Sequence, residues 1–183
     1  MLIIIIITVV VLLLLFVMLT YNRLVRFRNN RENAFADIDV QLNLRHDLIP
    51  QLVDTVKGYM KHENETLVKL TQARSAAISA ENINQKIDAE NQLSAALGGL
   101  KVSVEAYPEL KASTNFMQLQ EEMADIENKL AAVRRYFNST TREYNNAVET
   151  FPANLVAKIL GFKREKMFEV NEQQRMPSDT TFK

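Results

Sequence analysis

Two histidines are the first candidates for chemistry in this chain, because histidine is the usual general base and metal ligand near neutral pH. His62 is followed by Glu63, but the second histidine of the zinc-protease pattern His-Glu-x-x-His is missing. His46 lies 16 residues before His62. That separation is about 24 Å along a helix, too far for the two side chains to share one metal ion. We therefore expect exposed histidines without a catalytic role.

Other patterns that would indicate an enzyme are also missing from the sequence. Neither of the glycine-rich nucleotide motifs, GxGxxG and GxxxxGK[ST], occurs, and neither does the GxSxG motif of hydrolases. The chain has no cysteine, which excludes disulfides, thiolate zinc sites and cysteine nucleophiles. Glu121, Glu122 and Asp125 are typical of a solvated acidic face, and Arg134-Arg135-Tyr136 of charge beside a helix seam rather than an anion site. The sequence thus predicts no enzyme, no cofactor, no metal site and no small-molecule substrate.

Charge is balanced over the whole chain and unevenly distributed along it. The 183 residues contain 22 basic and 22 acidic side chains, and this zero net charge argues against a nucleic-acid binder. By segment, the net charge is +4 over residues 1–31, −6 over 32–157, +3 over 158–168 and −1 over 169–183. Only four glycines and four prolines are present, which argues against an all-β fold.

Residues 1–20, MLIIIIITVVVLLLLFVMLT, carry no ionisable side chain. Residues 2–19 would make a helix of about 27 Å, close to the roughly 30 Å hydrocarbon core of a bilayer. A cleaved signal peptide would need a basic start and a small-residue cleavage site, and a buried core helix is rarely apolar on every face. We therefore predict a transmembrane anchor over residues 1–20.

Four arginines follow this apolar segment before any acidic residue does: Arg23, Arg26, Arg28 and Arg31. The positive-inside rule keeps such a cluster in the cytoplasm. We expect a single-pass protein of the cell membrane, with its N-terminus outside and the rest of the chain in the cytoplasm.

The apolar residues after Tyr21 recur at helical spacing and predict four helices, at about 21–60, 63–80, 84–106 and 115–151. Leu42, Ile49 and Val56 keep a seven-residue step across Pro50, which predicts one kinked helix rather than two. Gly98-Gly99, in the middle of the third helix, predicts a close helix crossing there.

The fourth helix carries the clearest pattern, a seam that steps by three and four residues from Phe116 to Phe151, with Thr140 as its one distinctly polar member. A self-associating coiled coil is one use of such a seam. Four stripes in one chain favour the other use, an intramolecular, up-and-down antiparallel four-helix bundle over residues 21–152. The predicted fold class is therefore all-α, a transmembrane helix followed by this bundle.

Residues 153–170 predict a short basic amphipathic segment in which Gly161 caps a helix, and residues 171–183 predict a disordered tail. An up-and-down bundle returns its fourth helix to the membrane, so the basic and apolar residues 153–168 would meet the anionic leaflet. The alternative is that the segment packs back on the base of the bundle. The candidate membrane-surface residues are Arg23, Arg26, Arg28 and Arg31 together with Lys158, Lys163, Arg164 and Lys166.

Several stretches carry a family likeness. YNRLVRFRNNRENAFADIDVQLNLRHDLIPQLVDTVKGYMKHE resembles the signature region of the LemA family, and AYPELKAS, ENKLAAVRRYFNSTTREYNNAVETFP and ILGFKREKMFEV are similar to later parts of it. The resemblance covers about residues 21–170 and implies a bacterial or archaeal single-pass membrane protein with a helical bundle. It implies no enzymatic activity and no cofactor. A divergent branch of the family is linked to magnetosome membranes.

We therefore expect a membrane-anchored scaffold or adaptor whose partners are the lipid bilayer and an unidentified protein, or a second copy of itself. The alternative is a membrane-shaping protein that acts by self-assembly. An enzyme with an unrecognised site is the weakest of the three hypotheses.

Overall fold

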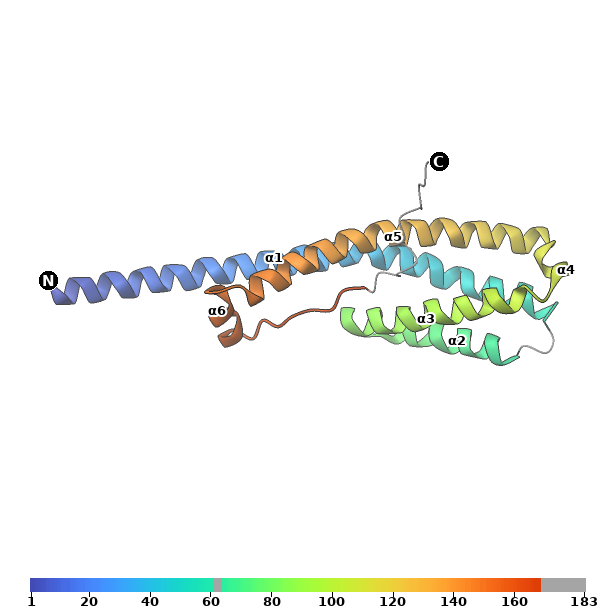
Figure 1. The fold of residues 1–183 in the computed structure, drawn as a ribbon, viewed down its shortest axis with the longest axis horizontal. Coiled ribbons are helices and arrows are strands. Elements are labelled where there is room, and N and C mark those ends of the chain that lie inside the picture. The colour runs from blue at the N-terminus through green and yellow to red at the C-terminus, as the bar shows by residue number, and fades with distance from the viewer. Residues whose placement is uncertain (61–63, 169–183) are drawn as a thin grey trace, which may run out of the picture.

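A computed structural model describes residues 1–60 and 64–168 of the chain. Within these ranges every regular element is a helix, which confirms the all-α part of the predicted class. The elements are α1 (Leu2–Lys57), α2 (Asn64–Ser79), α3 (Ile83–Val104), α4 (Pro108–Lys111), α5 (Thr114–Glu149) and α6 (Ala153–Ile159) (Figure 1). His62 and the predicted disordered tail, residues 171–183, lie outside the described residues.

Helix α1 is a single element of 56 residues, about 84 Å long at 1.5 Å per residue. Its first 20 residues and its packed part form one continuous helix, so no break in the backbone marks the end of the predicted anchor. Pro50 lies inside α1 without ending it, as the seven-residue spacing predicts. A proline cannot bond the carbonyl four residues earlier, here that of His46. Arg74 of α2 donates its Nε–H to this carbonyl at 2.7 Å.

The long helices α1, α2, α3 and α5 run alternately in opposite directions, and α1 lies alongside α5 while α2 lies alongside α3 (Figure 1). All four contribute to one buried cluster at the end of the molecule away from the N-terminus. The members of this cluster include Ile49, Val56, Leu70, Leu93, Leu100 and Phe116.

A second cluster lies between α1 and α5 and is built around three aromatic rings. The ring centroids of Phe35 and Phe137 are 5.6 Å apart, and those of Phe137 and Phe168 are 5.7 Å apart. Most of the predicted seam of α5 is buried, and Thr140 is buried too, donating its hydroxyl to the Phe137 carbonyl at 2.9 Å. Phe151 is the exception: it follows the end of α5 and is 75% exposed.

The predicted close crossing at Gly98-Gly99 is wrong. A Cβ atom added at either glycine would meet nothing within 4 Å apart from its own helix and chain neighbours. The two glycines therefore carry no packing contact that a side chain would disturb. Gly98 instead lines a cavity between α3 and α5, described below.

Helix α6 and the residues after it take different courses. Val156 and Ala157 are buried and form the inner side of α6. Gly161 follows the end of the helix with φ +77°. Phe162 donates its backbone N–H to the Ala157 carbonyl at 2.9 Å. This is the helix-ending role predicted for Gly161. Residues 162–168 then run back alongside the helices without regular secondary structure (Figure 1).

Candidate functional site

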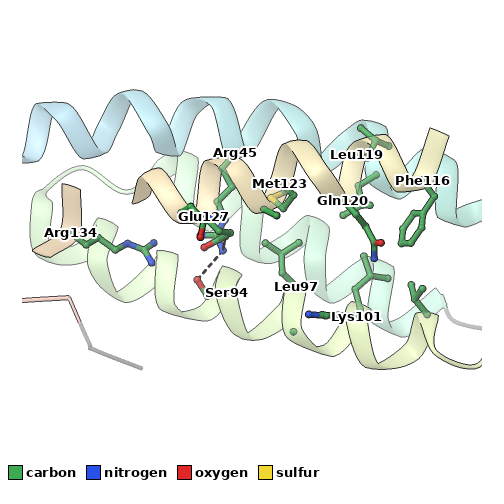
Figure 2. A pocket seen from close by; sticks show the side chains of 16 residues that line it. Arg45, Ser94, Leu97, Lys101, Phe116, Leu119, Gln120, Met123, Glu127 and Arg134 are labelled. Carbon is green, nitrogen blue, oxygen red and sulfur yellow. Dashed lines mark hydrogen bonds and ion pairs between the residues drawn. The ribbon is translucent and has the colours of Figure 1, made fainter. Parts of the chain in front are cut away.

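A cavity of about 690 Å³ lies between α3 and α5, and Arg45 and Leu52 of α1 also line it. Figure 2 shows how its lining is divided: Leu119 and Phe116 lie toward one end, Leu97 and Lys101 lie between, and Arg45, Glu127 and Arg134 lie toward the other. The charged end is built by Arg45 of α1, Ser94 of α3, and Glu127 and Arg134 of α5. The volume falls in the range of small-molecule pockets, and the mixed lining makes this the first candidate site.

Arg45 is the centre of the charged end and is only 1% exposed. Its Nη1 donates to Glu90 Oε2 at 2.9 Å, and its Nη2 lies 3.0 Å from Ser94 Oγ and 2.8 Å from Glu127 Oε1. His46 Nε2 is 2.6 Å from the other oxygen of Glu90, within hydrogen-bond distance. This buried network ties α1 to α3 and α5.

The expectation of exposed histidines is wrong for His46, whose side chain is buried against Glu90. The sequence gives only a weak signal for this burial, because the pattern around Arg45, His46 and Glu90 resembles a solvated helix face. Within the described ranges, no three His, Asp or Glu side chains gather in a way that would hold a metal ion. The polar groups here bind mainly one another.

Arg134 lies at the rim of the cavity with its guanidinium 4.8 Å above the ring of Phe168. Burial lowers its pKa from the ordinary value, and the nearby charge of Arg45 acts in the same direction. Its Nε and Nη2 are buried without a hydrogen-bond partner among the described residues. The cation–π contact with Phe168, together with the nearby charges of Glu127 and Glu90, stabilises this side chain.

The predicted membrane-surface arginines do not share one environment. Arg23, Arg26 and Arg28 are exposed, and Arg23 and Arg28 stack on the rings of Phe27 and Phe162 at 5.4 and 5.6 Å.

Arg31 differs from the expectation, because its side chain is 4% exposed and faces inward. It donates to Asn84 Oδ1 at 3.1 Å, pairs with Glu165 at 3.4 Å and lies 5.1 Å above the ring of Phe137. Burial lowers its pKa from the ordinary value, against the opposing charge of Glu165. Arg31 therefore joins α1, α3 and the C-terminal segment.

The predicted basic residues of the C-terminal segment also divide into two groups. All four are exposed, but Lys158 and Lys163 form no ion pair with another described residue. Arg164 pairs with Glu149 at 3.1 Å, and Lys166 pairs with Asp88 of α3. The second group lies where the segment packs back on the helices, which is the alternative considered for it.

Two asparagines on α5 fix this packing, and the sequence reasoning missed both. The side-chain amide of Asn145 accepts from the Glu165 backbone N–H at 2.8 Å and donates to its carbonyl at 2.9 Å. Asn138, seven residues earlier, does the same for Phe168 at 2.9 and 3.0 Å. Each amide thus replaces the backbone partner that a neighbouring strand would supply. The signal in the sequence is a polar pair at one heptad spacing beside the seam.

Comparison with known proteins gives one matching family and several relatives. The family model described as "LemA family" matches residues 34–182. "Protein LemA" of Metamycoplasma hominis is 30% identical, over 87% of this chain and 74% of that protein. "Magnetosome protein MamQ" of Magnetospirillum gryphiswaldense is 22% identical over 83% of this chain, and "Magnetosome protein MamQ 2" of Paramagnetospirillum magneticum is 21% identical over 84%. The chain spans 65% and 66% of the lengths of these two magnetosome proteins.

Proposed function

Since the chain belongs to the LemA family, we propose that it is a single-pass membrane protein whose four-helix bundle serves in the cytoplasm as a non-enzymatic scaffold or adaptor. Its partners in this role are the lipid bilayer and a protein that docks on the bundle surface. Magnetosome proteins among its relatives support a role at a membrane.

The observation that carries this proposal is the exposure of the apolar start of α1. The helix contains an 18-residue window with a mean hydropathy of 3.7, and none of that window is buried inside the protein. Large aliphatic side chains such as Ile5 and Leu12 are 58% and 61% exposed. At about 25 cal/mol per Å² of apolar surface, a run of this kind is costly in water and favourable in lipid.

Continuity of α1 supports the scaffold role. The same helix that would cross the bilayer carries Ile38, Leu42 and Ile49 into the buried core without a flexible linker. The bundle would therefore stand on the membrane as an extension of the anchor. The buried charges around Arg45 are engaged with one another, which supports surfaces rather than a reactive pocket as the functional part.

Orientation follows from the three exposed arginines Arg23, Arg26 and Arg28, which the positive-inside rule keeps in the cytoplasm. Because the chain lacks cysteine, Val102→Cys places a single reactive thiol on the bundle, at a side chain that is 73% exposed. A membrane-impermeant maleimide should label this variant only after the cells are opened. Labelling of intact cells would overturn the orientation.

The anchor is tested by alkaline carbonate extraction of membranes that contain the full chain. The chain should stay in the membrane pellet, and the variant with Leu12→Arg and Leu13→Arg should be released, because each arginine at the centre of a span costs about 2.5–3.5 kcal/mol. The matched variant with Leu12→Ala and Leu13→Ala should stay. Release of the unaltered chain would overturn the anchor.

The adaptor role is tested by crosslinking in native membranes followed by identification of the crosslinked proteins. We expect one protein to be recovered reproducibly with the full chain and not with the extractable variant. Recovery of self-crosslinks alone would contradict the adaptor role and favour the alternative, a membrane-shaping protein that self-assembles.

A further inference from the structure

Helix α6 exposes the most prominent apolar side chains outside the apolar start of α1. Ile159 is 83% exposed and Phe151, just before the helix, is 75% exposed. Apart from Met1, no other large apolar residue among those described has a higher exposed fraction than these two, the first residues of α1 included. Leu155 and Leu160 are 57% and 45% exposed. Four such residues within ten positions form a patch rather than scattered apolar exposure.

The patch is held in place by the opposite side of α6. Val156 and Ala157 are buried, and Ala157 belongs to the cluster that contains Leu24 and Tyr144. Leu155 and Ile159 are one turn apart and therefore share a face. The exposed side chains are thus presented outward by an anchored helix.

The position of α6 along α1 suggests what covers this patch. Phe151, Pro152 and Ala153 line a small cavity together with Phe16 and Thr20 of α1. Phe16 belongs to the wholly apolar segment, and Thr20 ends it. The patch therefore lies at the level where the proposed membrane span meets the cytoplasm, as the place of α6 beside α1 in Figure 1 also indicates.

Basic side chains border the patch on the same end of the molecule. Lys158 and Lys163 are exposed, and neither forms an ion pair with another described residue, whereas Arg164 pairs with Glu149 at the end of α5 and Lys166 pairs with Asp88 of α3. An apolar face with a basic border is typical of helices that lie in the interface of an anionic membrane.

We propose that α6 lies in the headgroup region of the leaflet that the anchor enters, with Phe151, Leu155 and Ile159 reaching the acyl boundary. This inference rests on the proposed membrane anchor. It narrows the predicted membrane contact from residues 153–168 to α6 and its flanks, because the backbone of Glu165 and Phe168 is hydrogen-bonded to α5. The bundle would then be attached to the bilayer at two points rather than one.

The test uses the full chain in vesicles of phosphatidylcholine and phosphatidylglycerol. Because the chain has no cysteine, three single variants, Leu12→Cys, Ile159→Cys and Val102→Cys, each take one NBD fluorophore. Lipids with a doxyl group near the headgroup quench fluorophores that enter the acyl boundary. Val102 is the matched control, because it is an aliphatic side chain with 73% exposure on α3, distant from α6 (Figure 1).

We expect the label at Ile159 to shift its emission to the blue and to be quenched about twofold, because an interfacial helix buries its apolar face about 5–10 Å deep. The label at Val102 should show neither change. If Ile159 behaves as Val102 does while Leu12 is in lipid, α6 lies in water and the inference falls although the anchor stands. If Leu12 is also outside lipid, the proposed anchor itself falls.

A second copy of the chain is the other occupant that the patch would accept. A blue shift at Ile159 without lipid quenching, accompanied by crosslinks between Ile159→Cys chains, would assign the patch to self-association and overturn the inference. Quenching of Ile159 that persists when labelled chains are diluted with unlabelled ones would support it.

Discussion

Replacing Glu90 by leucine should destabilise the protein strongly, because it leaves the Arg45 guanidinium buried with one carboxylate fewer. Arg45 and Glu90 are each 1% exposed and 2.9 Å apart, and Glu90 also binds His46 at 2.6 Å. The other carboxylate partner, Glu127, is 38% exposed and therefore screened by solvent. Removing one member of a buried ion pair costs about 3–5 kcal/mol.

The double variant with Arg45→Met and Glu90→Leu separates the charge effect from simple loss of packing. It removes both buried charges and keeps side chains of similar volume. Replacement of a whole buried pair by apolar residues is often neutral or stabilising. We therefore expect the double variant to regain about 3 kcal/mol relative to Glu90→Leu alone.

Urea unfolding of the full chain in detergent micelles, followed by far-UV circular dichroism, measures these free energies. The control is Lys129→Met on α5, which removes an exposed pair with Asp125, one turn away; the two side chains are 57% and 62% exposed. Loss of such a pair costs about 0.3–0.5 kcal/mol. The reasoning is refuted if Glu90→Leu costs no more than Lys129→Met, or if the double variant is as unstable as the two single changes added together.

Three further predictions follow from particular residues. Gly98→Ala and Gly99→Ala should each stabilise α3 by about 0.5–1 kcal/mol in urea unfolding, because a Cβ meets nothing there; destabilisation would contradict the open geometry. Phe168→Ala should lower the urea midpoint by an amount equivalent to about 3–5 kcal/mol, since its ring is buried; an unchanged midpoint would show that the segment is detached. Burial, with the Glu165 carboxylate second, raises the pKa of the Tyr144 phenol. The stability linked to this raised pKa is present below about pH 10, the pKa of tyrosine in the unfolded chain, and is lost as the pH rises through the folded pKa. Tyr144→Phe should therefore lose less stability on alkaline titration than the unaltered chain does, and equal losses would contradict this assignment.

The elements that depend on local pattern could be predicted from the sequence. The unbroken seam of α5 and the seven-residue step across Pro50 both describe one face of a helix, and burial follows from that face. Gly161 could be predicted for the same kind of reason, because its role depends on its own backbone and a few neighbours.

The buried polar groups could not be predicted in this way, because their burial depends on partners distant in sequence. Arg45 and Glu90 are 45 positions apart, and nothing local distinguishes them from solvated residues. Asn138 and Asn145 are buried by a segment that follows about 20–30 positions later. The prediction of a close crossing at Gly98-Gly99 is wrong for the opposite reason. Two glycines permit a second helix to approach closely, but they do not determine that one does.

Pro50 and Arg74 show how one local irregularity is compensated across the fold. The proline removes one backbone hydrogen bond from α1 at the His46 carbonyl, inside the packed part of the molecule. An unpaired buried carbonyl is costly, and the charged Nε–H of Arg74 satisfies it at 2.7 Å. Since Arg74 belongs to α2, the irregularity binds α2 to α1 at a defined register.

The partners of the basic residues in the structure give these residues different roles. Of the eight predicted to face a membrane, three form ion pairs within the fold: Arg31 with Glu165, Arg164 with Glu149 and Lys166 with Asp88. Only Arg31 is buried, and the other two pairs are exposed. The other five are exposed around α6 and the end of the apolar segment and form no ion pair with another described residue: Arg23, Arg26, Arg28, Lys158 and Lys163. A lipid surface attracts a basic side chain by about 1 kcal/mol only when that side chain lies near it, since the potential falls off within a Debye length. Arg31 is buried and favours the fold whatever the lipid composition, so any dependence of the protein's orientation on anionic lipid must come from the seven exposed residues.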